Sequence, residues 1–217
     1  MSKSAFAPVL MLAGLVACAA LAGCKETDPA PADTDAGVTL DLGAIDVDAG
    51  AGLSCQANVP VEPFGTQVGR KLRPLTLGQC DGTPYSIYSD DFCSPTRFTV
   101  LGIAAGWCVP CQYESAMLPA LQDEYEPKGV RIIQVMFQDA DYNAASNEYC
   151  QAWVDNYSLT NVELNDPTQL TQVYFPMGAL PATLIIDDTG TIVYREYGAS
   201  SMLSSLRTKL DELLAAP

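Results

Sequence analysis

The sequence contains no histidine at any of its 217 positions. This absence excludes Ser-His-Asp and Cys-His nucleophilic centres, in which an imidazole takes the proton from the attacking side chain. It also excludes every zinc site that uses an imidazole ligand. The eight cysteines therefore remain the conspicuous reactive side chains.

Basic residues are also scarce, with 11 Lys and Arg against 26 Asp and Glu, and the formal net charge is −15. Proteins that bind nucleic acid need clustered Lys and Arg side chains to contact the phosphates, so we expect no nucleic-acid partner. The same negative charge disfavours attraction to anionic lipid headgroups. Any attachment to a membrane must therefore be covalent or hydrophobic.

The first 24 residues have the features of an export signal. A short start with one positive charge, Lys3, precedes an apolar run from Ala5 to Ala22. A charged start, an apolar run and a small-residue cleavage site are typical of a secretory signal peptide, which is removed from the mature protein. The alternative is an uncleaved membrane-spanning helix of about 17 residues, at the short limit for crossing a bilayer.

The end of this segment, Leu21-Ala22-Gly23-Cys24, resembles the lipobox of bacterial lipoproteins. The resemblance implies that Cys24 becomes the new N-terminus and carries lipid. Several acyl chains on one residue give stable membrane anchoring. We therefore expect a periplasm-facing protein of the bacterial cell envelope, and the sequence leaves open whether the anchor lies in the inner or the outer membrane.

Residues 25–54 are expected to form a disordered acidic tether. Seven acids face one base, Lys25, over this segment, and it contains no aromatic residue. Such a composition cannot bury enough apolar surface to offset the entropy lost on ordering. Residues 55–217 then form a single domain.

This domain alternates between segments of strand and of helix character. Strands are expected at 98–105, 130–137, 182–186 and 192–194, and helices at 109–125, 143–156, 166–174 and 202–214. A hairpin is expected at 75–87, where two short apolar segments flank Cys80-Asp81-Gly82. This order predicts an α/β fold in which a mixed central sheet is flanked by helices, with an N-terminal β-hairpin extension.

The segment Trp107-Cys108-Val109-Pro110-Cys111 lies where a predicted strand ends and a helix begins. A thiol at a helix N-terminus faces unpaired N–H groups, which favour the thiolate. Pro110 is tolerated in the first turn of the helix because the N–H that proline lacks would be unpaired there anyway. Cys111 lies on the same helical turn, close enough to resolve a mixed disulfide. The pattern predicts a redox centre with Cys108 as the nucleophile. A structural disulfide without turnover and a zinc half-site are the alternatives.

A Trp-Cys-x-Pro-Cys motif after a buried strand resembles the thioredoxin superfamily, and in particular its TlpA/ResA-like periplasmic thiol–disulfide oxidoreductases. The resemblance extends over about residues 64–215 and includes the hairpin with Gly82, Glu114 after the second cysteine, the segment 178–183 and the turn 187–190. It implies a thioredoxin-like fold and no metal or cofactor beyond the cysteine pair. The partners that it implies are protein dithiols and disulfides, with an upstream thiol–disulfide electron donor.

The resemblance also assigns roles to individual residues. It implies that Pro181 follows a cis peptide bond and lies against the active-site disulfide, and that Leu180 offers its backbone to a substrate chain. Trp107 is expected to pack beside the disulfide. Glu114 is expected to tune the thiols or contact partners, although the residue pattern by itself favours a helix carboxylate in solvent.

Two positions depart from the family pattern. Gly102 stands six residues before the first cysteine, where thioredoxin itself has a buried acid. The group that takes the proton from Cys111 is therefore not identified by the resemblance. The helix proline falls at Pro119, later than is usual in the family.

After export, four further cysteines remain in an oxidising compartment: Cys55, Cys80, Cys93 and Cys150. Four cysteines allow three pairings. We favour Cys80–Cys93, which closes a short loop beside the hairpin, and Cys55–Cys150, which staples the N-terminal edge to a helix. An electron relay from the redox centre to a second pair is the alternative to this structural role.

The leading functional hypothesis is a monomeric protein that exchanges thiols and disulfides, as a reductant rather than an oxidant. Val109-Pro110 supplies no charge that would stabilise the thiolate and favour oxidation. One alternative is a lipid-anchored binding domain with an inert disulfide. Another is a peroxidase of the peroxiredoxin type, for which Gly106-Trp107-Cys108 lacks the Pro/Thr-rich approach to the cysteine.

Overall fold

The computed structural model describes residues 61–88, 95–176, 179–199 and 203–216. The predictions for the signal segment 1–24, the tether 25–54 and the lipidation of Cys24 lie outside these residues, as do Cys55 and Cys93 themselves. Among the described residues, no helix is both long and apolar enough to cross a membrane.

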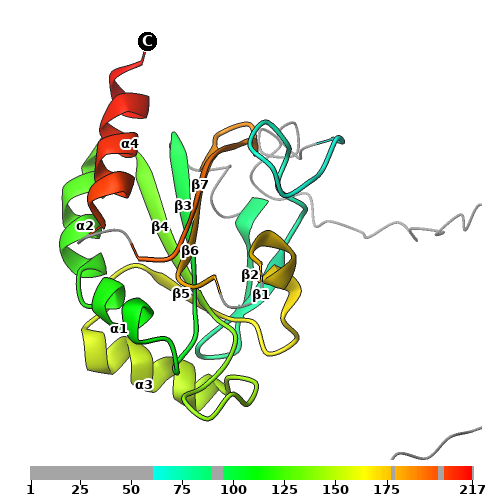
Figure 1. Ribbon diagram of the computed structural model, residues 1–217, viewed down its shortest axis with the longest axis vertical. Helices are drawn as coiled ribbons and strands as arrows, with labels where there is room; N and C mark the ends of the chain where they lie inside the picture. Colours follow the sequence, from blue (N-terminus) through cyan, green and yellow to red (C-terminus); the bar gives the residue numbers. More distant parts are fainter. Residues whose placement is uncertain (1–60, 89–94, 177–178, 200–202, 217) are drawn as a thin grey trace, which may run out of the picture. The chain divides into compact units, whose positions relative to one another are not determined.

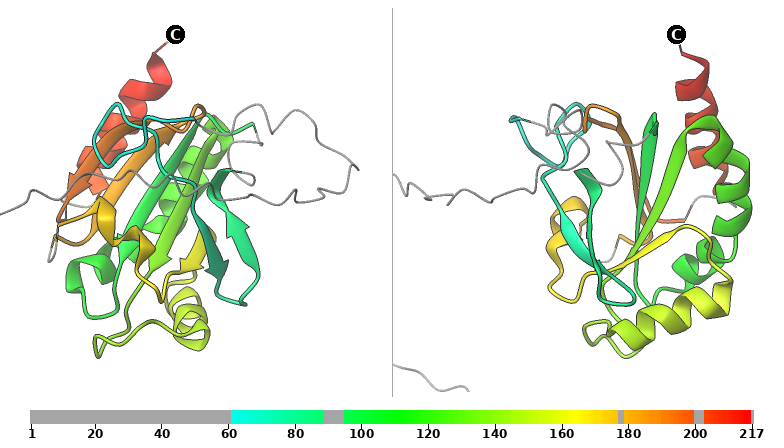
Figure 2. Two further views of the ribbon diagram at one scale, coloured as in Figure 1. Left: turned by 90° about the vertical axis from the view of Figure 1, so that its right-hand side faces the viewer. Right: turned by 180° about the vertical axis from the view of Figure 1, so that it is seen from behind.

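The described residues form a sheet of seven strands in the order β2-β1-β5-β4-β3-β6-β7 (Figure 2). The strands are β1 (Thr76–Gln79), β2 (Pro84–Ser86), β3 (Phe98–Ala104), β4 (Val130–Met136), β5 (Val162–Asn165), β6 (Ala182–Asp187) and β7 (Ile192–Tyr197). β3 pairs in parallel with β4 and antiparallel with β6, and β4 pairs in parallel with β5. The predicted mixed central sheet is therefore confirmed.

The two central strands, β3 and β4, are almost continuously apolar and almost entirely buried. Parallel strands that are covered on both faces have this composition, because each side chain meets a helix or a loop. Figure 1 shows α1 (Val109–Ser115), α2 (Leu118–Tyr125) and α4 (Ser204–Ala215) on one side of the sheet. The 3₁₀ helix η4 (Leu170–Tyr174) lies on the other side.

The single helix predicted for 109–125 is in fact two helices, α1 and α2, separated by Ala116 and Met117. Pro119 lies in the first turn of α2. Proline has no N–H to donate to the carbonyl four residues earlier, here that of Ser115, so the hydrogen-bond ladder of one continuous helix is interrupted. A short 3₁₀ helix, η3 (Glu126–Lys128), then follows α2 and ends at Gly129, whose φ is +83°.

The helix predicted to begin near residue 143 begins later, as α3 (Asn147–Tyr157). Ser146 caps this helix, and its hydroxyl accepts a hydrogen bond of 3.1 Å from the Tyr149 N–H. Strand β5 was not predicted. It has only four residues, and its buried Glu163 and Asn165 hide the apolar character by which strands are recognised.

The hairpin around Gly82 consists of β1 and β2, and β1 also pairs antiparallel with β5. This second pairing brings the hairpin turn against α3, where Cys80 forms a disulfide with Cys150 at a Cα–Cα distance of 5.2 Å. The favoured pairings Cys80–Cys93 and Cys55–Cys150 are therefore wrong. The correct pairing depends on the contact between β1 and β5, which sequence spacing does not reveal.

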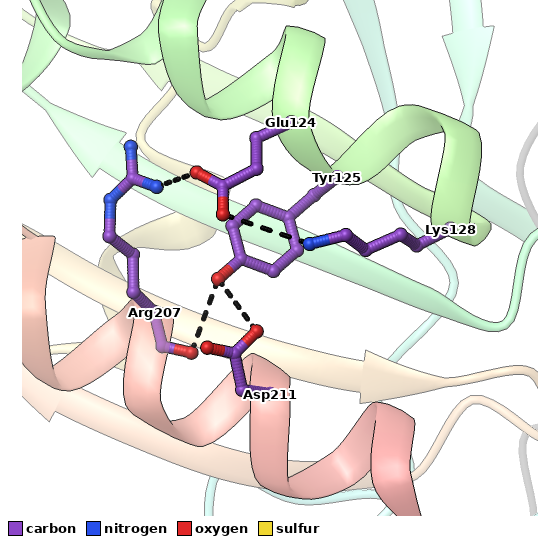
Figure 3. Close-up of polar contacts among 5 residues, drawn as sticks. All are labelled: Glu124, Tyr125, Lys128, Arg207 and Asp211. Atoms are coloured by element: carbon purple, nitrogen blue, oxygen red, sulfur yellow. Dashed lines mark hydrogen bonds and ion pairs between the residues drawn. The ribbon is translucent and has the colours of Figure 1, made fainter.

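Tyr125 joins α2 to α4 on the helix-covered side of the sheet (Figure 3). Its side chain is completely buried, and its hydroxyl donates a hydrogen bond of 3.0 Å to Asp211, with the Arg207 carbonyl 3.4 Å away. Glu124 forms ion pairs with Arg207 and with Lys128, and the Lys128 ammonium lies 4.2 Å from the centre of the Tyr125 ring. The hydroxyl of Tyr125 thus fixes how the last helix packs.

We expect Tyr125→Phe to lower the free energy of unfolding by about 1 kcal/mol, because the Asp211 carboxylate loses a partly buried donor. Urea unfolding followed by circular dichroism measures this change. Tyr113→Phe is the matched control, since the Tyr113 side chain is 72% exposed. Equal stability of the two variants would contradict the role of the Tyr125 hydroxyl.

Candidate active site

Cys108 and Cys111 lie where the chain leaves β3 and enters α1. Cys108 is the N-cap residue of α1, and its sulfur accepts a hydrogen bond of 3.2 Å from the Cys111 N–H. The two sulfurs form a disulfide of 2.03 Å. Cys108 is 4% exposed and Cys111 is completely buried. Of the two residues, only Cys108 keeps some exposure to solvent, which fits a nucleophile followed by a resolving thiol.

Trp107 is held beside the disulfide by the loop that follows β4. Its indole N–H donates a hydrogen bond of 3.0 Å to Gln138 Oε1, and its ring stacks on Tyr142 with the centroids 5.0 Å apart. The amide of Gln138 in turn donates to the Tyr142 carbonyl, at 3.0 Å. Asp139 fixes the loop by accepting backbone hydrogen bonds from Asp141 and Asn143, at 2.8 and 2.9 Å. Trp107 is thus positioned by a network that does not involve α1.

A groove of ≈ 350 Å³ begins at Trp107. Aromatic and apolar side chains make up most of its walls, together with three glutamines. The lining residues are Trp107, Phe137, Gln138, Tyr142, Gln169, Gln172, Phe175 and Leu180. Beside it, Val109, Tyr113 and Tyr142 are 54%, 72% and 65% exposed. Large exposed apolar side chains around one disulfide are characteristic of a surface that binds another molecule.

The Leu180–Pro181 peptide bond is cis, as the family resemblance implies. Leu180 is buried and borders the groove with Trp107, whereas Pro181 borders a small cavity that also contains Glu114. The Pro181 carbonyl accepts a hydrogen bond of 2.8 Å from the Gly198 N–H. The two residues therefore stand between the groove and the interior of the domain.

Glu114 is buried, with 8% of the residue exposed, so the interpretation as a solvated carboxylate is wrong. It lies on α1 one turn after Cys111, the spacing at which residues share a helix face. The cavity beside it has a volume of ≈ 20 Å³, enough for one water molecule. Burial, and then the nearby carboxylate of Glu196, raise the pKa of Glu114 to about 7.

The residue that makes room for Glu114 is Gly102. Glu196, Thr183, Gly102, Gln134 and Glu163 are paired directly across neighbouring strands, so they form one row on one face of the sheet. Gly102 contributes no side chain to this row, and it borders the same cavity as Glu114. An acid from the helix, Glu114, therefore lies over the strand position that Gly102 leaves without a side chain.

Several residues of the site were missed by sequence reasoning. Gln138 and Tyr142 hold Trp107, and Glu196 raises the pKa of Glu114. Gly106 has no room for a side chain, because a Cβ would lie 2.7 Å from the Ala140 nitrogen. Gly106, directly before Trp107, was the only one of these residues that the sequence could have indicated. The contacts of Gln138, Tyr142 and Glu196 join segments that are distant along the chain.

A model of the Redoxin family matches residues 67–210, about two thirds of the chain. The chain belongs to the Redoxin family. Bacillus subtilis thioredoxin-like protein YneN is 29% identical over 128 residues, which cover 59% of this chain and 70% of that protein.

Two solved structures resemble this member of the Redoxin family in fold. A Chlorobium tepidum protein assigned as the thiol:disulfide interchange protein DsbE is 18% identical, with a TM-score of 0.58 over 70% of this chain and 100% of that one. A secreted Mycobacterium tuberculosis disulfide oxidoreductase is 20% identical, with a TM-score of 0.50 over 66% of this chain and 96% of that one. The predicted thioredoxin-like fold is confirmed.

The raised pKa of Glu114 makes stability depend on pH. In the folded state Glu114 holds its proton up to about pH 7, whereas in the unfolded chain it ionises near 4.5. The folded state binds the extra proton between these values, so this residue's contribution to stability is lost as the pH rises through about 7.

Glu114→Gln keeps the shape of the side chain but carries no titrating proton. We expect the difference in unfolding free energy, variant minus wild type, to increase from about pH 5 to about pH 9. Urea unfolding of the oxidised proteins measures it, and Glu126→Gln at an exposed carboxylate is the matched control. A difference for Glu114→Gln that stays constant with pH would contradict a buried, protonated Glu114.

Proposed function

We propose that this protein is a thiol–disulfide oxidoreductase that reduces protein disulfides through Cys108 and Cys111. The observation that carries the proposal is the Cys108–Cys111 disulfide after β3, in which Cys108 is slightly exposed and Cys111 is completely buried. The fold and the Redoxin family membership support the same class of chemistry. We also propose that the protein is of the TlpA/ResA-like type.

In the proposed reaction, the Cys108 thiolate attacks one sulfur of a substrate disulfide and forms a mixed disulfide. The Cys111 thiolate then attacks the sulfur of Cys108, the mixed disulfide breaks, and the substrate leaves with two thiols. The N-cap position of Cys108 favours its thiolate form. Two electrons pass to the substrate, and Cys108–Cys111 is left oxidised.

Glu114 is the proposed proton acceptor for Cys111. A thiol must lose its proton before it attacks, and a buried thiol needs a nearby base, because water has little access to it. A group whose pKa is about 7 both accepts and returns a proton at neutral pH. This role supplies the acid–base group that the family resemblance left unidentified.

The proposed substrates are polypeptides that lie against the exposed apolar side chains of Val109, Tyr113 and Tyr142. Leu180 lines the groove, and its backbone is the proposed hydrogen-bonding partner of an extended substrate chain. We propose reduction rather than oxidation because Val109 and Pro110 place no charge between the cysteines. An upstream dithiol protein then has to return the pair to the reduced state.

The proposed location is the periplasmic face of the bacterial cell envelope, with a lipid anchor on Cys24. The signal-like segment 1–24 and its lipobox-like end support this proposal. The Mycobacterium tuberculosis neighbour is described as secreted. The tether 25–54 would then separate the domain from the membrane.

One observation favours a second candidate, a binding domain with an inert disulfide. Cys108 is only 4% exposed, so a substrate thiol has narrow access to it. Trapping of a mixed disulfide distinguishes the two candidates, because an inert bridge forms none.

We expect the reduced Cys111→Ser variant to accumulate a mixed disulfide between Cys108 and disulfide-bonded insulin, because the resolving thiol is missing. Cys108→Ser is the matched control and should form no such species, because Cys111 is completely buried. Non-reducing electrophoresis and mass spectrometry identify the adduct. Absence of the adduct in Cys111→Ser, with a native circular dichroism spectrum, would support the inert disulfide.

A further inference from the structure

The disulfide between Cys80 and Cys150 has the same asymmetry of exposure as the pair at the candidate active site. Cys80 is 8% exposed and Cys150 is completely buried, against 4% and complete burial for Cys108 and Cys111. Cys80 lies in the hairpin turn after β1, and Cys150 lies in the first half of α3. The two pairs thus each join one slightly exposed cysteine to one that is completely buried.

Cys80 opens onto a groove of ≈ 300 Å³ between the hairpin and α3. Glu163 of β5 lines the same groove, and the Cys80 sulfur lies 3.8 Å from the Glu163 backbone carbonyl oxygen. Asp81, Gln151 and Asn161 also border it. Cys80 and Glu163 therefore border one groove that is open to solvent.

Glu163 is 6% exposed, and no described residue makes a well-formed hydrogen bond to its carboxyl oxygens, for which the Asn161 side chain is only a weak partner. Burial raises its pKa well above the ordinary value, and this weak hydrogen bond lowers it only in part. A buried polar group without a partner destabilises the fold. A disulfide that only joins the hairpin to α3 has no use for such a group, whereas a disulfide that opens and closes needs a proton donor.

We propose that Cys80–Cys150 is a second thiol–disulfide exchange site, with protein dithiols as its substrates and Glu163 as its proton donor. Glu114 and Cys108–Cys111 present the same combination on the same face of the sheet. Gly102 and Glu163 lie in one row on either side of Gln134, so Glu163 is two strands away from the position over which Glu114 lies. The proposal does not depend on exchange at Cys108–Cys111.

In the proposed step, one thiolate of the substrate dithiol attacks the Cys80 sulfur. The bond between Cys80 and Cys150 breaks, and the departing Cys150 sulfur takes the proton of Glu163. The second substrate thiol then attacks the mixed disulfide at the substrate sulfur, and its proton passes to the released Cys80. The substrate is oxidised to a disulfide by two electrons, the Cys80–Cys150 pair is reduced to two thiols, and Glu163 is left ionised until solvent reprotonates it.

The experiment follows reduction of each pair separately in the full, natively folded chain. Dithiothreitol supplies the dithiol, acid quenches the reaction, and an isotope-coded alkylating reagent followed by mass spectrometry reports the peptides that contain Cys80 and Cys150. We expect these two cysteines to become labelled together without denaturant, and to be reoxidised reversibly. In the variant Cys108→Ser/Cys111→Ser, this exchange should persist.

Glu163→Gln tests the proton donor, because it keeps the shape of the side chain but removes its acid. We expect it to slow reduction of Cys80–Cys150 at least about a hundredfold, the lower end of general acid–base catalysis. Glu148→Gln, at an exposed acid on α3, the helix that carries Cys150, is the matched control and should leave the rate unchanged. The rate at Cys108–Cys111 in the same sample reports whether the variant is natively folded.

Two results would overturn the proposal. One is that Cys80 and Cys150 are labelled only after urea has unfolded the domain, as for a purely structural bridge. The other is that Glu163→Gln is reduced as fast as wild type while its rate at Cys108–Cys111 is also that of wild type. Loss of exchange at Cys108–Cys111 alone would contradict only the function proposed for that pair.

Discussion

The pairing of β3 with β4 on one side and with β6 on the other is the constraint on which the site depends. β3 is held along its whole length by parallel and antiparallel ladders, and its side chains are almost all buried. Its carboxyl end is therefore a fixed point, from which the chain turns into α1 and presents Cys108. The cis bond before Pro181 immediately precedes β6, so β3 also aligns the second wall of the site.

The helix-covered face of this sheet carries acids that a hydrophobic core would exclude. Glu114 and Glu163 are both buried, and burial raises the pKa of each. Keeping a carboxylic acid neutral is less costly than burying its charge, but an unpaired buried acid still destabilises the fold. Each of the two acids lies near a disulfide, where a proton has to move when the bond opens. The proposed roles in thiol chemistry would explain why the fold keeps both acids despite their cost to stability.

Local sequence patterns predict the main elements because apolar runs and turn residues are local signals. The strands around 98–105 and 130–137 and the motif from Trp107 to Cys111 lie where they were expected. Features that depend on long-range pairing were not predictable. Strand β5 is too short and polar to recognise, the partner of Cys80 follows from β1 lying beside β5, and the burial of Glu114 follows from the space above Gly102.

The most direct test of the central claim is the reduction potential of Cys108–Cys111 in the folded protein. The protein is equilibrated in glutathione or dithiothreitol buffers, quenched with a thiol label, and the fraction of labelled Cys108 is read by mass spectrometry. A proposed reductant should exchange reversibly, with a potential near or below about −250 mV. A potential near about −120 mV would indicate an oxidant instead, and no exchange before unfolding would contradict a redox function at this pair.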